Sequence, residues 1–104
     1  MTLDGFGQMI AAIDPQARRY ANTGRGAYTV WREYGRIGAW AGGENEGGWR
    51  VQVDRYTREE NDAVAAAIAS ALEESDEIAF EHTVDSDLED GGVLIRHIFD
   101  CEVW

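Results

Sequence analysis

The sequence predicts an α+β domain with a largely antiparallel sheet, in the element order α-β-β-β-α-β-β, and with the helices packed on one face. Apolar residues recur at helical spacing in two segments, one near the N-terminus and one after residue 57. The other segments are rich in aromatic and β-branched residues, and several alternate apolar with polar residues as half-buried strands do. A chain of 104 residues without an internal repeat is expected to form a single domain, residues 1–104.

The first 26 residues are expected to form a helix and an arm ahead of the core, residues 27–104. Helical spacing predicts the helix between Leu3 and Ile13, and Pro15 lies just past its end. Two glycines inside this segment weaken the helix by about 1 kcal/mol each, so it is expected to depend on packing within the protein or against another subunit. Residues 16–26 have no periodicity and are interpreted as a linker or an extended arm.

Two strands and a loop are predicted at the start of the core. The run AYTVWREY, residues 27–34, and the run RIGAWA, residues 36–41, are read as strands with a turn at Gly35 between them. Residues 42–48 contain four glycines, which predicts a mobile hairpin loop.

A third strand, residues 49–56, leads into the best helical pattern of the chain, residues 57–75. Alternation in the strand predicts one buried face and one wet face, and Asp54 belongs to the wet face. Thr57 and Glu60 match the capping box T-x-x-E, which predicts that the helix starts at Thr57. The acidic residues gathered here therefore indicate a strand-to-helix corner rather than a catalytic pair of carboxylates; they are Asp54, Glu59, Glu60 and Asp62.

Two further strands are predicted to close the chain. They are residues 77–84 and residues 93–104, and the acidic turn 85–92 joins them. The turn superficially resembles a calcium-binding loop. Its spacing places Asp90 and Arg96 where the EF-hand requires Gly and Glu, so no calcium site is predicted.

His82, His97 and Cys101 are the candidate metal ligands of the sequence. If the last two strands pair, the three side chains come near one another, and such ligands hold zinc. However, C-x-x-C and H-x-x-x-H spacings are missing, and a lone buried cysteine usually behaves as a small hydrophobic residue. The histidines are therefore interpreted as residues at the edge of the core, and no metal or other cofactor is predicted. No nucleophile, phosphate-loop or dinucleotide motif is found, so no enzymatic activity is predicted.

The charge of the chain is strongly acidic and unevenly distributed. The formal net charge is −11, and all nine basic residues are arginines. Residues 1–58 contain eight arginines and six acidic residues, whereas residues 59–104 contain one arginine and fourteen acidic residues. Such a protein is poorly suited to bind a nucleic-acid backbone or an anionic membrane. Two interpretations stay open: a solvated acidic surface, or a head-to-tail contact between an arginine-bearing edge and the acidic edge of the next copy.

The sequence also predicts where the protein is made. No apolar run approaches the roughly 20 residues that are needed to span a bilayer. The N-terminus lacks the basic and apolar regions of a secretion signal. We therefore expect a protein that does not enter membranes and is made in a cytoplasm.

Three segments, taken in order, carry a resemblance to a known family. They are YTVWREYGRIGAWAG, RVQVDRYTREENDAVAAAIASALEE and GVLIRHIFDCEV, which cover most of residues 27–104. This order resembles the tail-completion and tail-terminator proteins of long-tailed bacteriophages and prophages. The Gly-rich loop AGGENEGG and the N-terminal segment depart from the pattern of that family. The matching residues are Tyr28, Val30, Trp31, Val51, Gln52, Val53, Asp54, Thr57, His97, Ile98, Phe99 and Asp100.

The resemblance implies a structural protein of the virion that forms a ring, usually of six copies, at the head-tail interface. Such a ring ends the tail tube, joins it to the head connector and lets the genomic DNA pass through its hole. The implied partners are other copies of the chain, the tail-tube protein and the head-connector protein. Assembly in the host cytoplasm is implied, and sequence-specific nucleic-acid binding is not.

Four residues are candidates for contacts with a subunit or partner. Arg18, Arg19 and Arg25 are predicted on the N-terminal arm beside an acidic remainder of the chain, and Asp54 is an acidic residue that helix capping does not explain. Two other functional classes stay open. One is a small α+β enzyme or ligand-binding module with a pocket between sheet and helix, and the other is an acidic DNA mimic or inhibitor.

Overall fold

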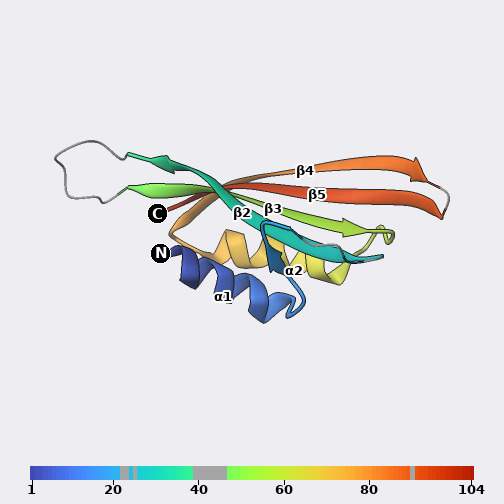
Figure 1. Ribbon diagram of the computed structural model, residues 1–104, viewed down its shortest axis with the longest axis horizontal. Coiled ribbons are helices and arrows are strands. Elements are labelled where there is room, and N and C mark those ends of the chain that lie inside the picture. Colours follow the sequence, from blue (N-terminus) through green and yellow to red (C-terminus); the bar gives the residue numbers. More distant parts are fainter. Residues whose placement is uncertain (22–23, 25, 39–46, 90) are drawn as a thin grey trace.

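The computed structural model describes residues 1–21, 24, 26–38, 47–89 and 91–104. The strands form one five-stranded sheet in the order β1-β2-β3-β5-β4, and both helices lie on the same face of it (Figure 1). The β1–β2 pair is parallel and the other three pairs are antiparallel. The predicted α+β class and element order are therefore confirmed. The elements are α1 (Leu3–Ile13), β1 (Arg18–Arg19), β2 (Tyr28–Ile37), β3 (Gly48–Thr57), α2 (Ala63–Glu74), β4 (Ile78–Glu89) and β5 (Gly92–Val103).

The hydrophobic core lies between the two helices and one face of the sheet, which we call the helix face. Alternate residues of the central strands point into it, as the period of two requires. Each large apolar side chain buried there contributes about 1.5–3 kcal/mol relative to an exposed one. The fully buried apolar residues are Phe6, Ile10, Val51, Val53, Ile68, Leu72, Phe99 and Val103.

The first helix has the predicted limits and a local start signal. The Thr2 side chain accepts a hydrogen bond of 2.9 Å from the backbone N–H of Gly5, which satisfies one of the free donors at the helix start. Phe6 packs edge-on against Trp31 of β2, with ring centroids 5.4 Å apart. Gly7 lies directly over the same indole, and a Cβ atom at this position would be 2.8 Å from the Trp31 ring. The helix therefore needs glycine here to approach the sheet closely.

Replacing Gly7 with alanine is accordingly expected to destabilise the protein by about 1–3 kcal/mol through overpacking, although alanine has the higher helix propensity. Gly5→Ala is the matched control, because its added Cβ would meet only the ends of the Thr2 and Met1 side chains, at 3.3 and 3.6 Å. Urea denaturation of both variants measures the difference. Equal stabilities would contradict a steric role for Gly7.

One prediction at the start of the sheet is wrong. Tyr28–Ile37 forms one strand, not two strands with a turn at Gly35. The strand pairs with β3 along its length, and its register shifts between Glu33 and Gly35. The turn signal of the glycine is overridden because continuous pairing with β3 satisfies the backbone donors and acceptors on both sides of the irregularity. The arm at residues 16–26 contains a short strand, β1. This strand stands in place of one of the two strands predicted in residues 27–41, so the element order is still the predicted one. Most of the predicted loop 42–48 lies outside the described residues.

The start of the second helix also differs from the prediction. Helix α2 begins at Ala63, and its N-cap is Asp62, whose side chain accepts a hydrogen bond from the Ala65 N–H. Thr57 is the last residue of β3, and its hydroxyl accepts from the Glu59 N–H in a local turn. The T-x-x-E pattern therefore marks the end of a strand rather than a capping box.

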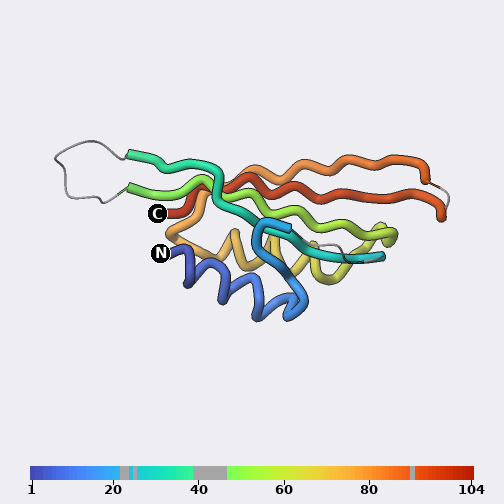
Figure 2. Tube along the Cα trace, in the orientation of Figure 1, coloured from blue at the N-terminus to red at the C-terminus, as the bar shows by residue number. Residues whose placement is uncertain are grey.

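The β4–β5 hairpin is longer than predicted and gives the molecule an elongated shape. Pairing continues without a register shift from Ile78↔Val103 to Glu89↔Gly92, so most of the predicted acidic turn is strand. The molecule measures 53 × 23 × 21 Å, and Figure 2 shows the strands running past the helices. The two chain ends lie side by side, where the Met1 amine contacts the Glu77 carboxylate and the Trp104 carbonyl. Neither of the two described helices is long and apolar enough to cross a membrane.

Candidate subunit interface

Two of the three predicted interface arginines, Arg18 and Arg19, lie at one edge of the sheet. Arg18 is exposed, and its guanidinium donates to the neighbouring carbonyl of Ala17 at 3.1 Å. Arg19 is also exposed, but it is engaged within the chain: its Nε donates to the Glu33 carboxylate at 3.0 Å, and its guanidinium lies 5.0 Å from the Trp31 ring. The hydrogen bond to Glu33 raises the pKa of Arg19. Arg18 is therefore the better candidate for an outside contact, and Arg25 lies outside the described residues.

Asp54 is on the open face of the sheet, which is the face that carries no helix. Its carboxylate accepts hydrogen bonds from Arg96 Nη2 at 2.9 Å and from Gln52 Nε2 at 3.1 Å, and its side chain is 13% exposed. Arg96 also lies over the Tyr56 ring, 5.6 Å from its centroid. The charge of Asp54 is thus already engaged within the chain, so any contact with a partner would have to share it.

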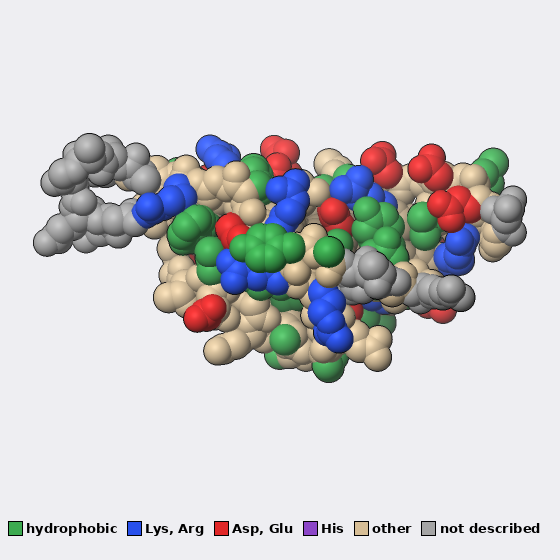
Figure 3. All heavy atoms as spheres, in the orientation of Figure 1, with side chains coloured by type: hydrophobic (Ala, Val, Ile, Leu, Met, Phe, Trp, Pro, Cys, Tyr) green, Lys and Arg blue, Asp and Glu red, His purple; other side chains and the backbone are tan. Residues whose placement is uncertain are grey.

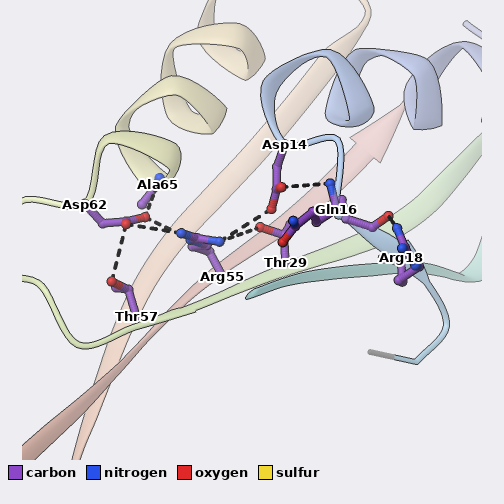
Figure 4. Close-up of polar contacts among 9 residues, drawn as sticks. Asp14, Gln16, Arg18, Thr29, Arg55, Thr57, Asp62 and Ala65 are labelled. Atoms are coloured by element: carbon purple, nitrogen blue, oxygen red, sulfur yellow. Dashed lines mark hydrogen bonds and ion pairs between the residues drawn. The ribbon is translucent and has the colours of Figure 1, made fainter. Parts of the chain in front are cut away.

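A buried polar cluster around Arg55 was not predicted from the sequence (Figure 4). The Arg55 guanidinium donates to both carboxylate oxygens of Asp62, at 2.9 and 3.3 Å, and to Asp14 at 3.4 Å. It also donates to the Thr29 hydroxyl at 3.3 Å, and the Thr57 hydroxyl donates to Asp62 at 3.3 Å. The cluster ties the C-terminal end of α1 to β2, β3 and the start of α2.

The acidic residues between Asp54 and Asp62 therefore have different surroundings and do not form one catalytic group. Asp62 is buried: burial raises the pKa of its carboxyl, but hydrogen bonds from Arg55 and the Ala65 N–H outweigh this and hold the pKa below its usual value. Glu59 and Glu60 are exposed beside it. The signal that could have revealed Arg55 is the alternation of β3, because Arg55 and Thr57 continue the buried parity of Val53.

The two histidines do come together, as expected if the last strands pair. His82 Nε2 lies 2.9 Å from His97 Nδ1, and His82 stacks on Phe99 with ring centroids 4.3 Å apart. Cys101 is buried on the same face of β5, opposite Phe80, and burial raises the pKa of its thiol to about 12, which makes it unreactive. Within the described residues, no group of three or more His, Cys, Asp or Glu side chains is arranged to hold a metal ion.

The His82–His97 pair predicts a stability change near neutral pH. Burial, and then the neighbouring His82, lower the pKa of His97 below 6.5, so the unfolded chain takes up a proton at this residue before the folded protein does. The stability contributed by neutral His97 is therefore fully present above about pH 6.5, and it is lost as the pH falls from that value to the lower pKa of His97 in the folded protein. Urea denaturation between pH 5 and 8 should show this loss in the wild type and a weaker one in His97→Gln. A variant with an unchanged pH dependence would contradict the assignment.

The strand order separates the charges of the chain onto the two edges of the sheet. At one edge, β1 and β2 carry Arg18, Arg19, Arg32 and Arg36 against Glu33 alone. At the other edge, β4 is almost wholly exposed and carries four acidic residues and no arginine; they are Glu81, Asp85, Asp87 and Glu89. Figure 3 shows acidic side chains gathered toward the end of the molecule that the β4–β5 hairpin forms.

This arrangement suits a contact in which the basic edge of one copy meets the acidic edge of another. Comparison with known proteins adds no assignment: no protein-family model matches the sequence, and no curated protein matches it either.

Proposed function

We propose that the protein is a structural subunit of a ring at the head-tail interface of a long-tailed bacteriophage. In this role, copies of the chain end the tail tube, join it to the head connector and surround the path of the DNA. The ring is expected to contain six copies, as the resemblance of residues 27–104 to tail-terminator proteins implies. The protein would then be part of the virion and would have no catalytic function.

The opposite charge of the two sheet edges is the observation that carries the proposal. A contact between unlike edges is heterologous, and repetition of a heterologous contact closes a ring if the rotation between copies is right. A twofold contact between two β4 edges would instead place acidic side chains against acidic side chains, which is unfavourable. The charges therefore favour a ring or a filament over a twofold dimer.

The overall charge agrees with a channel for DNA. At a net charge of −11, the protein repels the phosphate backbone, so a ring of copies would not bind the DNA that passes through its hole. An acidic surface alone would not distinguish a channel from a DNA mimic. The mimic, however, gives no reason for a separate basic edge on the same sheet.

Native mass spectrometry and negative-stain imaging over a range of protein concentrations test the proposal. We expect closed rings of one size, and binding of those rings to the tail-tube and head-connector proteins of the same phage. A protein that stays monomeric at every concentration and binds neither partner would contradict it.

A second candidate function is ligand binding, because a pocket of about 310 Å³ lies between α2 and the sheet. Its walls include the helix start, several alanines of α2, and His82 and His97. This volume is within the lower range of small-molecule sites. Mass spectrometry of the purified protein under native conditions would decide, since a stably retained small molecule or zinc ion would favour this function over the ring.

A further inference from the structure

In the part of the chain that the structure describes, no strand pairs with the outer edge of β4, and the hydrogen-bond pattern shows which residues direct backbone groups toward that edge. The Trp104 N–H donates to the Glu77 carbonyl at 2.7 Å, next to the Ile78↔Val103 pair. Hydrogen-bonded and non-hydrogen-bonded pairs alternate along an antiparallel ladder. Odd-numbered residues of β4 therefore bond to β5, and even-numbered residues direct their N–H and C=O groups outward. Those with exposed side chains are His82, Val84, Ser86 and Leu88.

The opposite edge of the sheet is also incompletely covered. Strand β1 pairs with β2 only at Val30 and Trp31, and the Tyr20 N–H adds one bond to the Trp31 carbonyl. The segment Arg32–Ile37 continues β2 past this point, and in the described part of the chain no strand lies on its outer side. Both edges can therefore accept a further strand.

Side chains of opposite charge from the two edges lie on the same face of the sheet. The acidic residues of β4 are all odd-numbered, which places them on the open face with Glu102 and Asp100, their neighbours in the register. Arg18 lies opposite Val30, and Arg32 lies in the same row as Gln52 and Asp100, so both arginines also belong to the open face. If the sheet continued from one copy into the next, acidic and basic side chains would meet on the same side of it.

We infer that the β4 edge of one copy pairs with the β1–β2 edge of the next copy, so that one sheet continues from subunit to subunit. The inference rests on the proposed ring and specifies how its subunits join. Strand directions agree with it, because β4 runs antiparallel to β2 within one copy, so copies that follow one another in a continuous sheet bring these edges together antiparallel. The acidic residues of β4 meanwhile prevent two β4 edges from pairing.

The Ser86→Pro variant tests the inference at the backbone. Proline removes the outward N–H of residue 86 and adds bulk at the free edge, and proline is tolerated on an edge strand when its nitrogen faces solvent. Ser86→Ala is the matched control, because it removes the hydroxyl and keeps the N–H. Native mass spectrometry is expected to show assembly of Ser86→Ala like that of the wild type, and a dissociation constant raised roughly tenfold or more for Ser86→Pro. Circular dichroism should show both variants folded.

Hydrogen exchange of the wild type provides a second test that needs no variant. In the assembled protein, the amides of His82, Val84, Ser86 and Leu88 are expected to exchange slowly, whereas in the dilute monomer they should exchange quickly. Rings that form with these amides unprotected, or that form equally well from a folded Ser86→Pro, would overturn the inference and leave the proposed function standing. A wild type that never assembles would overturn both.

Discussion

Replacing Arg55 with methionine is expected to lower the free energy of unfolding by about 3–5 kcal/mol, because the buried carboxylate of Asp62 then loses its cation. Both residues are less than a tenth exposed, and two hydrogen bonds join them. Asp14, which is 12% exposed, loses the same partner. A loss of this size is a large part of the total stability of a small domain, which is about 5–15 kcal/mol.

Urea denaturation at pH 7, followed by tryptophan fluorescence, measures the loss. Arg58→Met is the matched control, since Arg58 forms an exposed ion pair with Glu89 at 3.0 Å and its removal should cost at most about 1 kcal/mol. The double variant Arg55→Met/Asp62→Asn should recover part of the stability, because no unpaired charge then remains at Asp62. Equal losses in the two single arginine variants would show that the cluster does not stabilise the fold.

Reversing the charge of Arg32 is expected to raise the dissociation constant of the assembly about tenfold at each contact, because it replaces an attraction by a repulsion, each worth up to about 1 kcal/mol. Arg36→Glu is a closely matched control. Both arginines are exposed on β2, and each lies over an aromatic ring, Tyr34 at 5.6 Å and Trp49 at 5.1 Å. They differ in face, since the pairing of Arg36 with Trp49 and of Trp49 with Val103 places Arg36 on the helix face.

Analytical ultracentrifugation of the two variants at low and high salt provides the comparison. The difference between the dissociation constants of Arg32→Glu and Arg36→Glu should shrink at about 1 M salt, where the screening length is about 3 Å. If both reversals weaken assembly equally, the acidic and basic side chains do not meet on the open face, and a different contact must join the subunits.

Several local elements could be predicted from the sequence because neighbouring residues determine them. Helix α1 has the predicted limits, since both its apolar period and its Thr2 cap lie within a few residues of one another. Alternation predicts the closing strands, and the pairing of these strands brings His82 and His97 together. The α+β class follows from the order of these patterns along the chain.

Other features depended on residues far apart in the sequence. The short strand β1 has no hydrophobic pattern that would predict it, and it forms because residues 18 and 19 pair with the edge of β2. Helix α2 starts at the Asp62 cap rather than at the predicted Thr57 pattern, and the buried contact with Arg55 fixes Asp62 in place. Arg55 in turn meets Asp14, which is 41 residues away, so only the folded chain could reveal that pair.

By itself, the sequence determined the fold class, the amphipathic pattern of most elements, and the uneven distribution of charge along the chain. Only the tertiary structure decided where these charges lie on the surface of the folded protein. Because the strand order is β1-β2-β3-β5-β4, the arginine-rich first half supplies one edge of the sheet and the acidic second half supplies the other. A difference between two halves of a chain thereby becomes two edges of opposite charge, which is the physical basis for the contact between copies that we propose.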